Sequence, residues 1–314
     1  MDKFDALADA FLAACGEAGY RQVSDCNDGT YEGAFYLQYS TRKGLRNSAA
    51  VGYLGVVHHL PGVGENLRDH PYLRLSFECS QPITVNDVLR NPLLKVKEGL
   101  RFIFKREGIL AISSSTAQMN YRSHAGAKQP DLVLRLMPLS GKDRYARNAR
   151  YGLDPFPGFS FGVAVLQPRS IGTAHIQSPD PLQQAAMDPK YFSHEGDAQL
   201  FLDGVRVARR VAQMPALQPF VVRETRPGPQ VLDDAGLLDY MRNTIQTAWH
   251  MVGTCKMGID SSAVVDPELR VCGVANLRVI DSSICPTIPS SNTNIAAIAI
   301  GEKGADLLLA AAPA

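Results

Sequence analysis

Hydrophobic residues recur at helical spacing in three long stretches of the chain. Residues 4–18, 197–214 and 295–309 place apolar side chains three or four positions apart, which predicts one helix in each stretch. Gly19 and Pro215 follow the first two stretches and stand where a helix is expected to end. The third stretch is rich in small and apolar residues, which favours a buried helix.

A fourth hydrophobic stretch covers residues 84–111 and is interrupted by a proline. Pro92 breaks the helical pattern, so the pattern predicts two consecutive helices. Asn86 is expected to cap the first helix, and Gly108 is expected to close the second. A further short helix is predicted over residues 236–244.

Strands are indicated where β-branched and aromatic residues gather in short runs. Segments 72–79 and 131–138 have this character, and residues 113–121 between them are expected to turn the chain back toward a sheet. Residues 159–168 and 172–178 flank a short Arg-Ser-Ile-Gly turn, and we expect them to pair as a hairpin. Helices interspersed with such strands predict a chain of mixed α and β structure.

Composition narrows the class of partner. The chain has 314 residues and 45% hydrophobic content, enough for one large domain or two ordinary ones. Its 32 basic and 31 acidic side chains nearly balance, so no nucleic acid is expected and a small molecule is favoured. Arg206, Arg209 and Arg210 lie mostly off the apolar stripe of their helix, which fits a solvated face better than a phosphate site.

Cysteine usage and hydropathy indicate the compartment. The six cysteines show no CxxC spacing, so neither a zinc site nor a disulfide framework is indicated, and no bound metal is expected. No apolar run approaches the ~18 residues of a membrane-spanning helix. The first residues lack the basic and apolar regions of a secretion signal. We therefore expect a soluble, cytoplasmic protein without a transmembrane segment.

The carboxyl-terminal stretch 246–314 holds most of the candidate chemistry. His250 stands ahead of a Gly-Thr turn, and an imidazole can act as a general base near neutral pH. A short apolar strand over 277–280 is predicted to end at Asp281, and strand ends are where α/β proteins bind ligands. Residues 290–294 then supply cap residues for the last helix, whose free N–H groups can hold an anion or a ring edge.

Three ordered motifs resemble those of the glucose-methanol-choline (GMC) flavoprotein oxidoreductases, especially the choline-dehydrogenase-like alcohol dehydrogenases. They are LPGVGENLRDHP at 60–71, WHMVGTCKMG at 249–258 and NLRVIDSSICPTIPSSNTNIAAIAIGEKGADLL at 276–308. The resemblance implies an α+β fold, in which an antiparallel sheet flanked by helices forms the substrate-binding domain. A carboxyl-terminal strand and helix would belong to the FAD domain. The implied reaction is oxidation of a primary alcohol to an aldehyde, with hydride transfer to FAD.

The resemblance assigns the catalytic roles to two residues. His250 is implied to take the proton of the substrate hydroxyl, while Asn292 donates a hydrogen bond to the same oxygen. An amide can donate to an alkoxide but cannot take up the proton, so His250 would be the only base. Considered without the family, Asn292 is a plain helix cap. His70 and Asn66 in the first motif are expected to have structural roles.

The resemblance also implies contacts with the cofactor. Asp281 and Ser282 are expected near the flavin ribityl and pyrophosphate groups. Thr293 and Asn294 are expected near the pyrimidine edge of the isoalloxazine ring. Considered without the family, Asp281 is a turn former at the end of a strand.

The sequence departs from the family in the part that binds the dinucleotide. No hydrophobic strand leads into a G-x-G-x-x-G motif, and Gly62 and Gly64 are expected to shape a turn. The resemblance is therefore to a truncated form that lacks the amino-terminal FAD-binding Rossmann unit. The predicted divisions are a remnant helical segment and junction (1–59), the substrate-binding domain (60–245), and a carboxyl-terminal return with the catalytic and flavin-contact motifs (246–314).

This departure leaves a second hypothesis open. Without the phosphate-binding half we expect the chain alone to retain little or no flavin. It would then be a cofactor-free module, either a scaffold that binds apolar ligands or a His250-based lyase or isomerase. If it is the oxidoreductase, the apolar stretch 84–111 suggests an alcohol with a hydrophobic tail. The helix at 295–309 would lack its family partner sheet, which favours self-association through an exposed apolar face.

Overall fold

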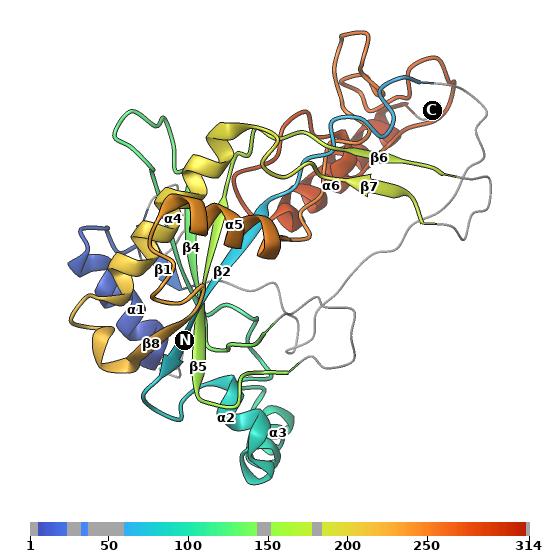
Figure 1. The fold of residues 1–314 in the computed structure, drawn as a ribbon. Helices are drawn as coiled ribbons and strands as arrows, with labels where there is room; N and C mark the ends of the chain where they lie inside the picture. Colours follow the sequence, from blue (N-terminus) through green and yellow to red (C-terminus); the bar gives the residue numbers. More distant parts are fainter. Residues whose placement is uncertain (1–5, 24–32, 37–59, 143–151, 178–183, 312–314) are drawn as a thin grey trace. The chain divides into compact units, whose positions relative to one another are not determined.

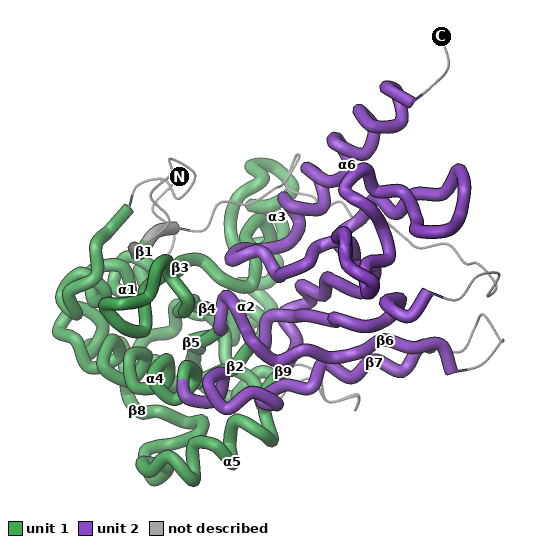
Figure 2. Tube along the Cα trace, turned by 90° about the horizontal axis from the view of Figure 1, so that it is seen from above, with its two compact units in different colours: residues 1–49, 72–164, 200–245 green, residues 50–71, 165–199, 246–314 purple. Residues whose placement is uncertain are grey.

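The computed structural model describes residues 6–23, 33–36, 60–142, 152–177 and 184–311. They form two compact units, each assembled from segments that are distant in the sequence (Figure 2). Unit 1 contains residues 1–49, 72–164 and 200–245, and unit 2 contains residues 50–71, 165–199 and 246–314. The units interleave along the chain, whereas the domains predicted from the sequence are consecutive.

Unit 1 is built on an antiparallel sheet (Figure 1). Its strands lie in the order β1-β3-β4-β5-β2-β8. Their bounds are Gly33–Tyr36 (β1), Ala117–Tyr121 (β3), Leu132–Met137 (β4), Gly158–Val165 (β5), Pro71–Cys79 (β2) and Val221–Arg226 (β8). The pairs β1–β3, β3–β4, β2–β5 and β2–β8 are antiparallel. The sheet confirms the predicted fold class and the strands expected within 72–79 and 131–138.

Two helices pack on one face of this sheet. Helix α1 (Ala6–Glu17) places Phe11 against Phe161 of β5, with ring centroids 5.3 Å apart. Helix α4 (Glu195–Ala212) approaches the same strand through Gly204, where an added Cβ would lie 2.4 Å from Cγ1 of Val163. Phe161 and Val163 are two positions apart on one strand and point to the same side. Both helices confirm the sequence prediction, as does the short helix α5 (Asp234–Thr244). The short helix η1 (Gln218–Phe220) was not predicted.

The two helices predicted within 84–111 are present as α2 (Val85–Arg90) and α3 (Pro92–Lys105). The cap of α2 is Thr84, however, so the prediction that Asn86 caps this helix is wrong. Asn86 is completely buried, and its Nδ2 donates to the carbonyl of Ser140 at 3.0 Å. A buried asparagine that binds a distant carbonyl and a capping asparagine have the same local sequence signature, which explains the error.

The hairpin predicted between residues 159–168 and 172–178 does not form. Strand β5 pairs with β2, whereas β6 (Thr173–His175) pairs with β7 (Ala186–Asp188). The intervening turn is bound elsewhere, because the backbone N–H groups of Arg169 and Ser170 donate to the carboxylate of Asp197 at 2.9 and 2.8 Å. These bonds hold the turn against the start of α4 and prevent it from closing a hairpin.

Unit 2 also contains β9 (Gln246–Thr247), η2 (Ser282–Ile284) and α6 (Thr293–Ala311). Its small core consists of Val264, Val265, Leu269, Val271 and Ile284, with further apolar residues packed against it. The strand predicted over 277–280 is not present as a strand. Arg278 forms an isolated antiparallel bridge to Arg270.

Gly62 and Gly64 shape a turn in unit 2, as predicted. Gly64 has a φ of +83°, and its N–H donates to the carbonyl of Thr254 at 2.8 Å. An added Cβ on Gly62 would lie 2.1 Å from the backbone oxygen of Ser262. The two glycines are therefore needed for close backbone approach.

Helix α6 exposes one apolar face to solvent. Its exposed apolar side chains are Ile295, Ile298, Leu308 and Leu309, and each has more than half of its surface accessible. The apolar spacing alone favoured a buried helix, which is wrong for this face, whereas the exposed apolar face expected without the family's partner sheet is present. Self-association through the face stays a prediction. Among the described residues, no helix has the length and apolar character needed to cross a lipid bilayer.

A matched pair of glycines tests the packing of α6. An added Cβ at Gly304 would lie 2.1 Å from Cγ2 of Ile280, whereas at Gly301 it would meet nothing within 4 Å. We expect Gly304→Ala to lower the free energy of unfolding by about 1–3 kcal/mol through overpacking. Gly301→Ala should raise it by about 0.5–1 kcal/mol, because alanine favours a helix over glycine. Urea unfolding followed by circular dichroism measures both, and equal effects would contradict this packing.

Candidate active site around His250

Two segments of unit 2 place His70 and His250 side by side. The segments run antiparallel, and Arg68 and Val252 exchange backbone N–H···O bonds of 3.0 and 2.9 Å. Trp249, directly before His250, has a φ of +61°. Such a left-handed conformation is costly for a large side chain and is a feature of sites where the fold imposes a specific geometry.

The two imidazoles form a buried hydrogen-bonded pair. The Nδ1 atoms of His70 and His250 are 2.9 Å apart, and the side chains are only 2% and 6% exposed. The Nε2 atom of His70 is 2.9 Å from the carbonyl oxygen of Leu166. A carbonyl only accepts hydrogen bonds, so Nε2 of His70 carries a proton. In the neutral pair Nδ1 of His70 is then the acceptor, Nδ1 of His250 is the donor, and Nε2 of His250 holds a lone pair.

Asp69 fixes the backbone of His250. Its Oδ1 accepts the N–H of His250 at 2.9 Å, and its Oδ2 accepts the hydroxyl of Tyr191 at 2.5 Å. Asp69 is 4% exposed, and this burial raises the pKa of its carboxyl above the usual value, against the lowering effect of the hydrogen bonds, the first of them from Thr247. Burial also raises the pKa of Tyr191, next to the Asp69 carboxylate. A buried, hydrogen-bonded carboxylate thus holds the backbone of His250.

Asn292 precedes the first residue of α6. Its Oδ1 accepts the backbone N–H of Asn294 at 3.1 Å, which is the interaction of a helix cap. The residue is exposed. The cap engages Oδ1 of Asn292, while the Nδ2 group of Asn292 carries two N–H donors. The convergence of His250 and Asn292 on one substrate oxygen stays a prediction.

Asp281 and Ser282 lie at the start of η2. The Asp281 carboxylate accepts the N–H of Ser283 at 2.7 Å, so this residue caps the short helix. The carbonyls of Ser282 and Ser283 accept the N–H groups of Gly253 and Cys255 at 3.4 and 2.8 Å. Ser282 and Ser283 therefore lie beside the segment that follows His250.

The residues predicted to contact the cofactor have chemistry that suits a flavin. Thr293 and Asn294 begin α6. The backbone N–H of Asn294 donates to Asn292, while the other N–H groups of this first helical turn favour electron-rich groups such as the carbonyls of an isoalloxazine ring. The carboxylate of Asp281 and the hydroxyl of Ser282 suit the hydroxyls of a ribityl chain. The donor set fits FAD, and each individual contact stays a prediction.

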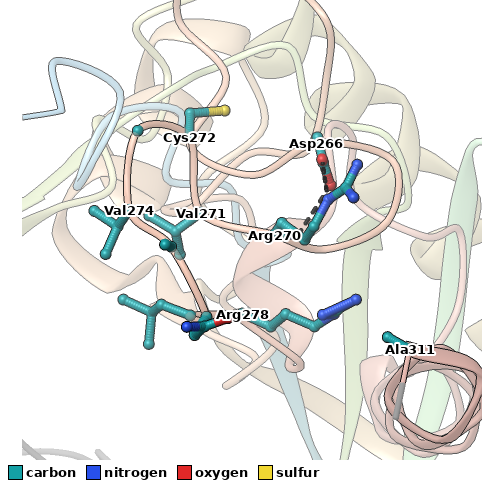
Figure 3. A pocket seen from close by; sticks show the side chains of 11 residues that line it. Asp266, Arg270, Val271, Cys272, Val274, Arg278 and Ala311 are labelled. Carbon is teal, nitrogen blue, oxygen red and sulfur yellow. Dashed lines mark hydrogen bonds and ion pairs between the residues drawn. The ribbon is translucent and has the colours of Figure 1, made fainter. Parts of the chain in front are cut away.

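Unit 2 also has a surface pocket, which is formed by other residues than the imidazole pair (Figure 3). It is lined by residues 270–278 together with Asp266 and Ala311, and it contains none of the six predicted site residues. Arg270 and Arg278 are the two cations that line it. Nε of Arg270 donates to Asp266 at 2.8 Å and its Nη1 lies 3.0 Å from Glu268, while Nε of Arg278 donates to the backbone carbonyl of Glu268 at 3.3 Å. Because carboxylates offset the charge of Arg270, we assign no anion-binding role to the pocket.

The arginines of α4 have structural partners. Arg206 binds Asp203 and Asp234 at 2.7 and 2.6 Å. Arg209 donates to both oxygens of Glu224 at 3.0 and 2.8 Å and is only 18% exposed, so it is less solvated than the sequence predicts. Both arginines are engaged by carboxylates, which argues against a phosphate site. In the described part of the chain, no group of three or more His, Cys, Asp or Glu residues is placed to hold a metal ion.

Sequence reasoning missed three residues of the site. His70 was expected to be structural, and Asp69 and Tyr191 were not considered. The Asp-His dipeptide of the first motif was the available signal. Its meaning depends on His250, which is 180 positions away in the chain, and a single sequence does not show that contact.

Comparison with known proteins identifies the family. Residues 168–301 match the family model described as GMC oxidoreductase. An oxygen-dependent choline dehydrogenase of Escherichia coli O45:K1 is 36% identical over 276 residues, covering 86% of this chain and 48% of the relative. One from Klebsiella pneumoniae subsp. pneumoniae is 38% identical over 256 residues, covering 81% and 45%. The chain thus spans about half the length of the curated relatives it matches.

Solved structures share the fold. Pyridoxine 4-oxidase from Mesorbium loti superposes with a TM-score of 0.79 at 19% identity, over 100% of this chain and 71% of that one. Formate oxidase from Aspergillus oryzae superposes with a TM-score of 0.85 at 18% identity, over 99% and 71%. The family model and the identity to the choline dehydrogenases agree: residues 168–301 of the chain belong to the GMC oxidoreductase family.

Proposed function

We propose that the protein oxidises a primary alcohol to an aldehyde, with FAD as the hydride acceptor and His250 as the base. The observation that carries the proposal is the imidazole pair, which leaves a lone pair on Nε2 of His250. Relatives named as oxygen-dependent choline dehydrogenases support an alcohol as the substrate class. Because the chain spans about half of those relatives, the activity of the whole protein is part of the proposal.

His250 would take the hydroxyl proton on Nε2. The positive charge that develops is stabilised because Nδ1–H of His250 donates to His70, whose own Nε2–H is held by the carbonyl of Leu166. These groups are already oriented before the reaction, so little reorganisation is needed. Asn292 would donate from Nδ2 to the same substrate oxygen, since its Oδ1 is engaged in the helix cap.

The flavin contacts complete the proposed site. FAD supplies, when bound, the acceptor for the hydride that leaves the carbinol carbon. Asp281 and Ser282 would hold its ribityl and pyrophosphate region, and Thr293 and Asn294 its pyrimidine edge. The chemistry of these donors and the first turn of α6 support this assignment.

Asp69 would act as a positioning residue. Its carboxylate holds the N–H of His250, while Tyr191 and Thr247 hold the carboxylate. The φ of +61° at Trp249 is maintained next to this bond. A carboxamide at position 69 would replace one acceptor oxygen by a donor, so it would not satisfy both partners.

A histidine replacement tests the base directly. In protein loaded with FAD, His250→Gln should lower kcat for alcohol oxidation by about 10²–10⁴-fold, the usual loss when a general base is removed. His124→Gln is the matched control, because His124 is exposed and belongs to unit 1. The rate is followed with an artificial electron acceptor. If His250→Gln oxidised the alcohol at the wild-type rate, His250 would not be the base. If the wild type, loaded with FAD, did not oxidise an alcohol, the proposed reaction would be wrong.

The burial of Asp69 predicts a pH dependence of stability. Its pKa is raised in the folded state above the ordinary value of 3.8, so the folded protein binds this proton more tightly than the unfolded chain. The contribution of Asp69 to the stability of the wild type should therefore fall as pH rises from about 3.8 through the folded pKa. Asp69→Asn lacks this titration, so the free energy of unfolding of the variant minus that of the wild type should increase over this range.

Asp260 provides the control of opposite sign. Hydrogen bonds from Ser262 and Lys256 lower its pKa to about 2, so its stabilising contribution is complete above the ordinary value of 3.8. The difference between wild type and Asp260→Asn should stay constant above that pH. Urea unfolding at a series of pH values measures both differences. A pH-independent difference for Asp69→Asn would show that burial does not perturb the Asp69 carboxyl.

A further inference from the structure

Helix α3 carries an apolar face that points to solvent. The face consists of Leu93, Val96, Leu100, Ile103 and Phe104, which recur at helical spacing and are 80%, 61%, 50%, 60% and 79% exposed. We call these five residues the outer face of α3. No residue of α3 is buried. The helix lies beyond the ends of the strands of unit 1, beside α2, which contacts it (Figure 1).

The contrast with α4 shows that this exposure is unusual. Both helices segregate apolar and polar residues strongly onto opposite faces. In α4 the apolar stripe is in the core, where Phe201, Val205 and Val211 are at most 1% exposed. The apolar residues of 84–111 that suggested a hydrophobic-tailed substrate are at the surface in α3, so they do not support that idea. A contiguous exposed apolar patch marks an interaction site.

The polar side of α3 is strongly basic. The exposed cations in and beside the helix are Arg90, Lys95, Lys97, Lys105 and Arg106. The one acid within the helix is Glu98, which lies 3.8 Å from Arg101 and accepts the N–H of Ile109. The formal charge of the whole chain is only +1, so basic charge is concentrated here while the remaining chain is net acidic.

We propose that α3 docks the protein on the surface of an anionic phospholipid bilayer. The outer face would enter the boundary between headgroups and acyl chains, and the flanking cations would bind the lipid phosphates. Fourteen helical residues extend about 21 Å, so the helix would lie along the bilayer and not cross it. Long lysine and arginine stems reach the headgroups while their helix lies deeper.

Charge complementarity favours a lipid surface over a second copy of this chain. Two outer faces packed together would bring two sets of flanking cations into proximity, and like charges facing each other oppose association. An anionic bilayer offers both an apolar layer and neutralising phosphates. The proposal is independent of the catalytic assignment, because α3 belongs to unit 1 and the imidazole pair to unit 2.

Vesicle flotation of the full chain tests the docking. Wild-type protein should float with phosphatidylcholine vesicles that contain roughly 30% phosphatidylglycerol. It should bind pure phosphatidylcholine vesicles at least about ten-fold more weakly, and raising NaCl from about 0.1 M to about 0.5 M should weaken binding to the anionic vesicles. No flotation with anionic vesicles would overturn the proposal.

Surface variants distinguish binding through the outer face from non-specific adsorption through any exposed apolar side chain. The double variant Leu100→Gln with Phe104→Gln should lose binding by about ten-fold or more, since both side chains insert. Lys95→Glu with Lys97→Glu should remove the preference for anionic vesicles. Leu309→Gln is the matched control, because Leu309 is 76% exposed on α6, and it should bind as the wild type does.

Circular dichroism and size-exclusion chromatography complete the test. All the replaced side chains are exposed, so each variant should keep the wild-type spectrum. If the outer-face double variant binds anionic vesicles as well as the wild type, α3 is not the docking element. If it instead converts a wild-type dimer to a monomer without changing vesicle binding, the face joins two copies of the chain, and lipid docking is wrong.

Discussion

The position of one proton on His70 determines the chemistry available at His250. The carbonyl of Leu166 can only accept, so it keeps a proton on Nε2 of His70 and makes the facing Nδ1 an acceptor. The Nδ1 proton of His250 is then committed to the pair, and its Nε2 is the atom that keeps a lone pair. A main-chain oxygen thus sets the tautomer of a side chain that it does not touch. The proposed base follows from this arrangement and from the buried position of both rings.

This arrangement depends on three segments that meet only in the folded chain. His70 comes from the first motif, Leu166 from the end of β5, and His250 from the carboxyl-terminal stretch. Close backbone approach joins them, as at Gly253, whose φ is +94° and whose added Cβ would lie 2.3 Å from the carbonyl of Asn66. Asn66 in turn donates to the carbonyls of Gly253 and Pro286 at 3.3 Å each. The same backbone network connects the imidazole pair to the segment that carries the proposed flavin contacts.

The helices could be predicted from the sequence because their signal is local. Apolar spacing located α1, α4 and α6, and Pro92 marked the division between α2 and α3. Pairings between distant segments could not be predicted in this way: residues 159–168 looked like one arm of a hairpin, yet β5 pairs with β2. The same limit applies to the site. The motifs pointed to His250, but the role of His70 requires a contact between residues 180 positions apart. Exposure is equally non-local, and α6 is exposed on a face that its apolar spacing alone suggests is buried.

Nitrogen-15 NMR of the imidazole rings tests the central claim most directly, because protonated and unprotonated ring nitrogens have distinct chemical shifts. With the pair neutral, His70 should be the Nε2–H tautomer, and His250 should be the Nδ1–H tautomer with an unprotonated Nε2. Spectra of His70→Gln and His250→Gln assign the two rings. A protonated Nε2 on a neutral His250 would contradict the account, because no lone pair would remain there to accept the substrate proton.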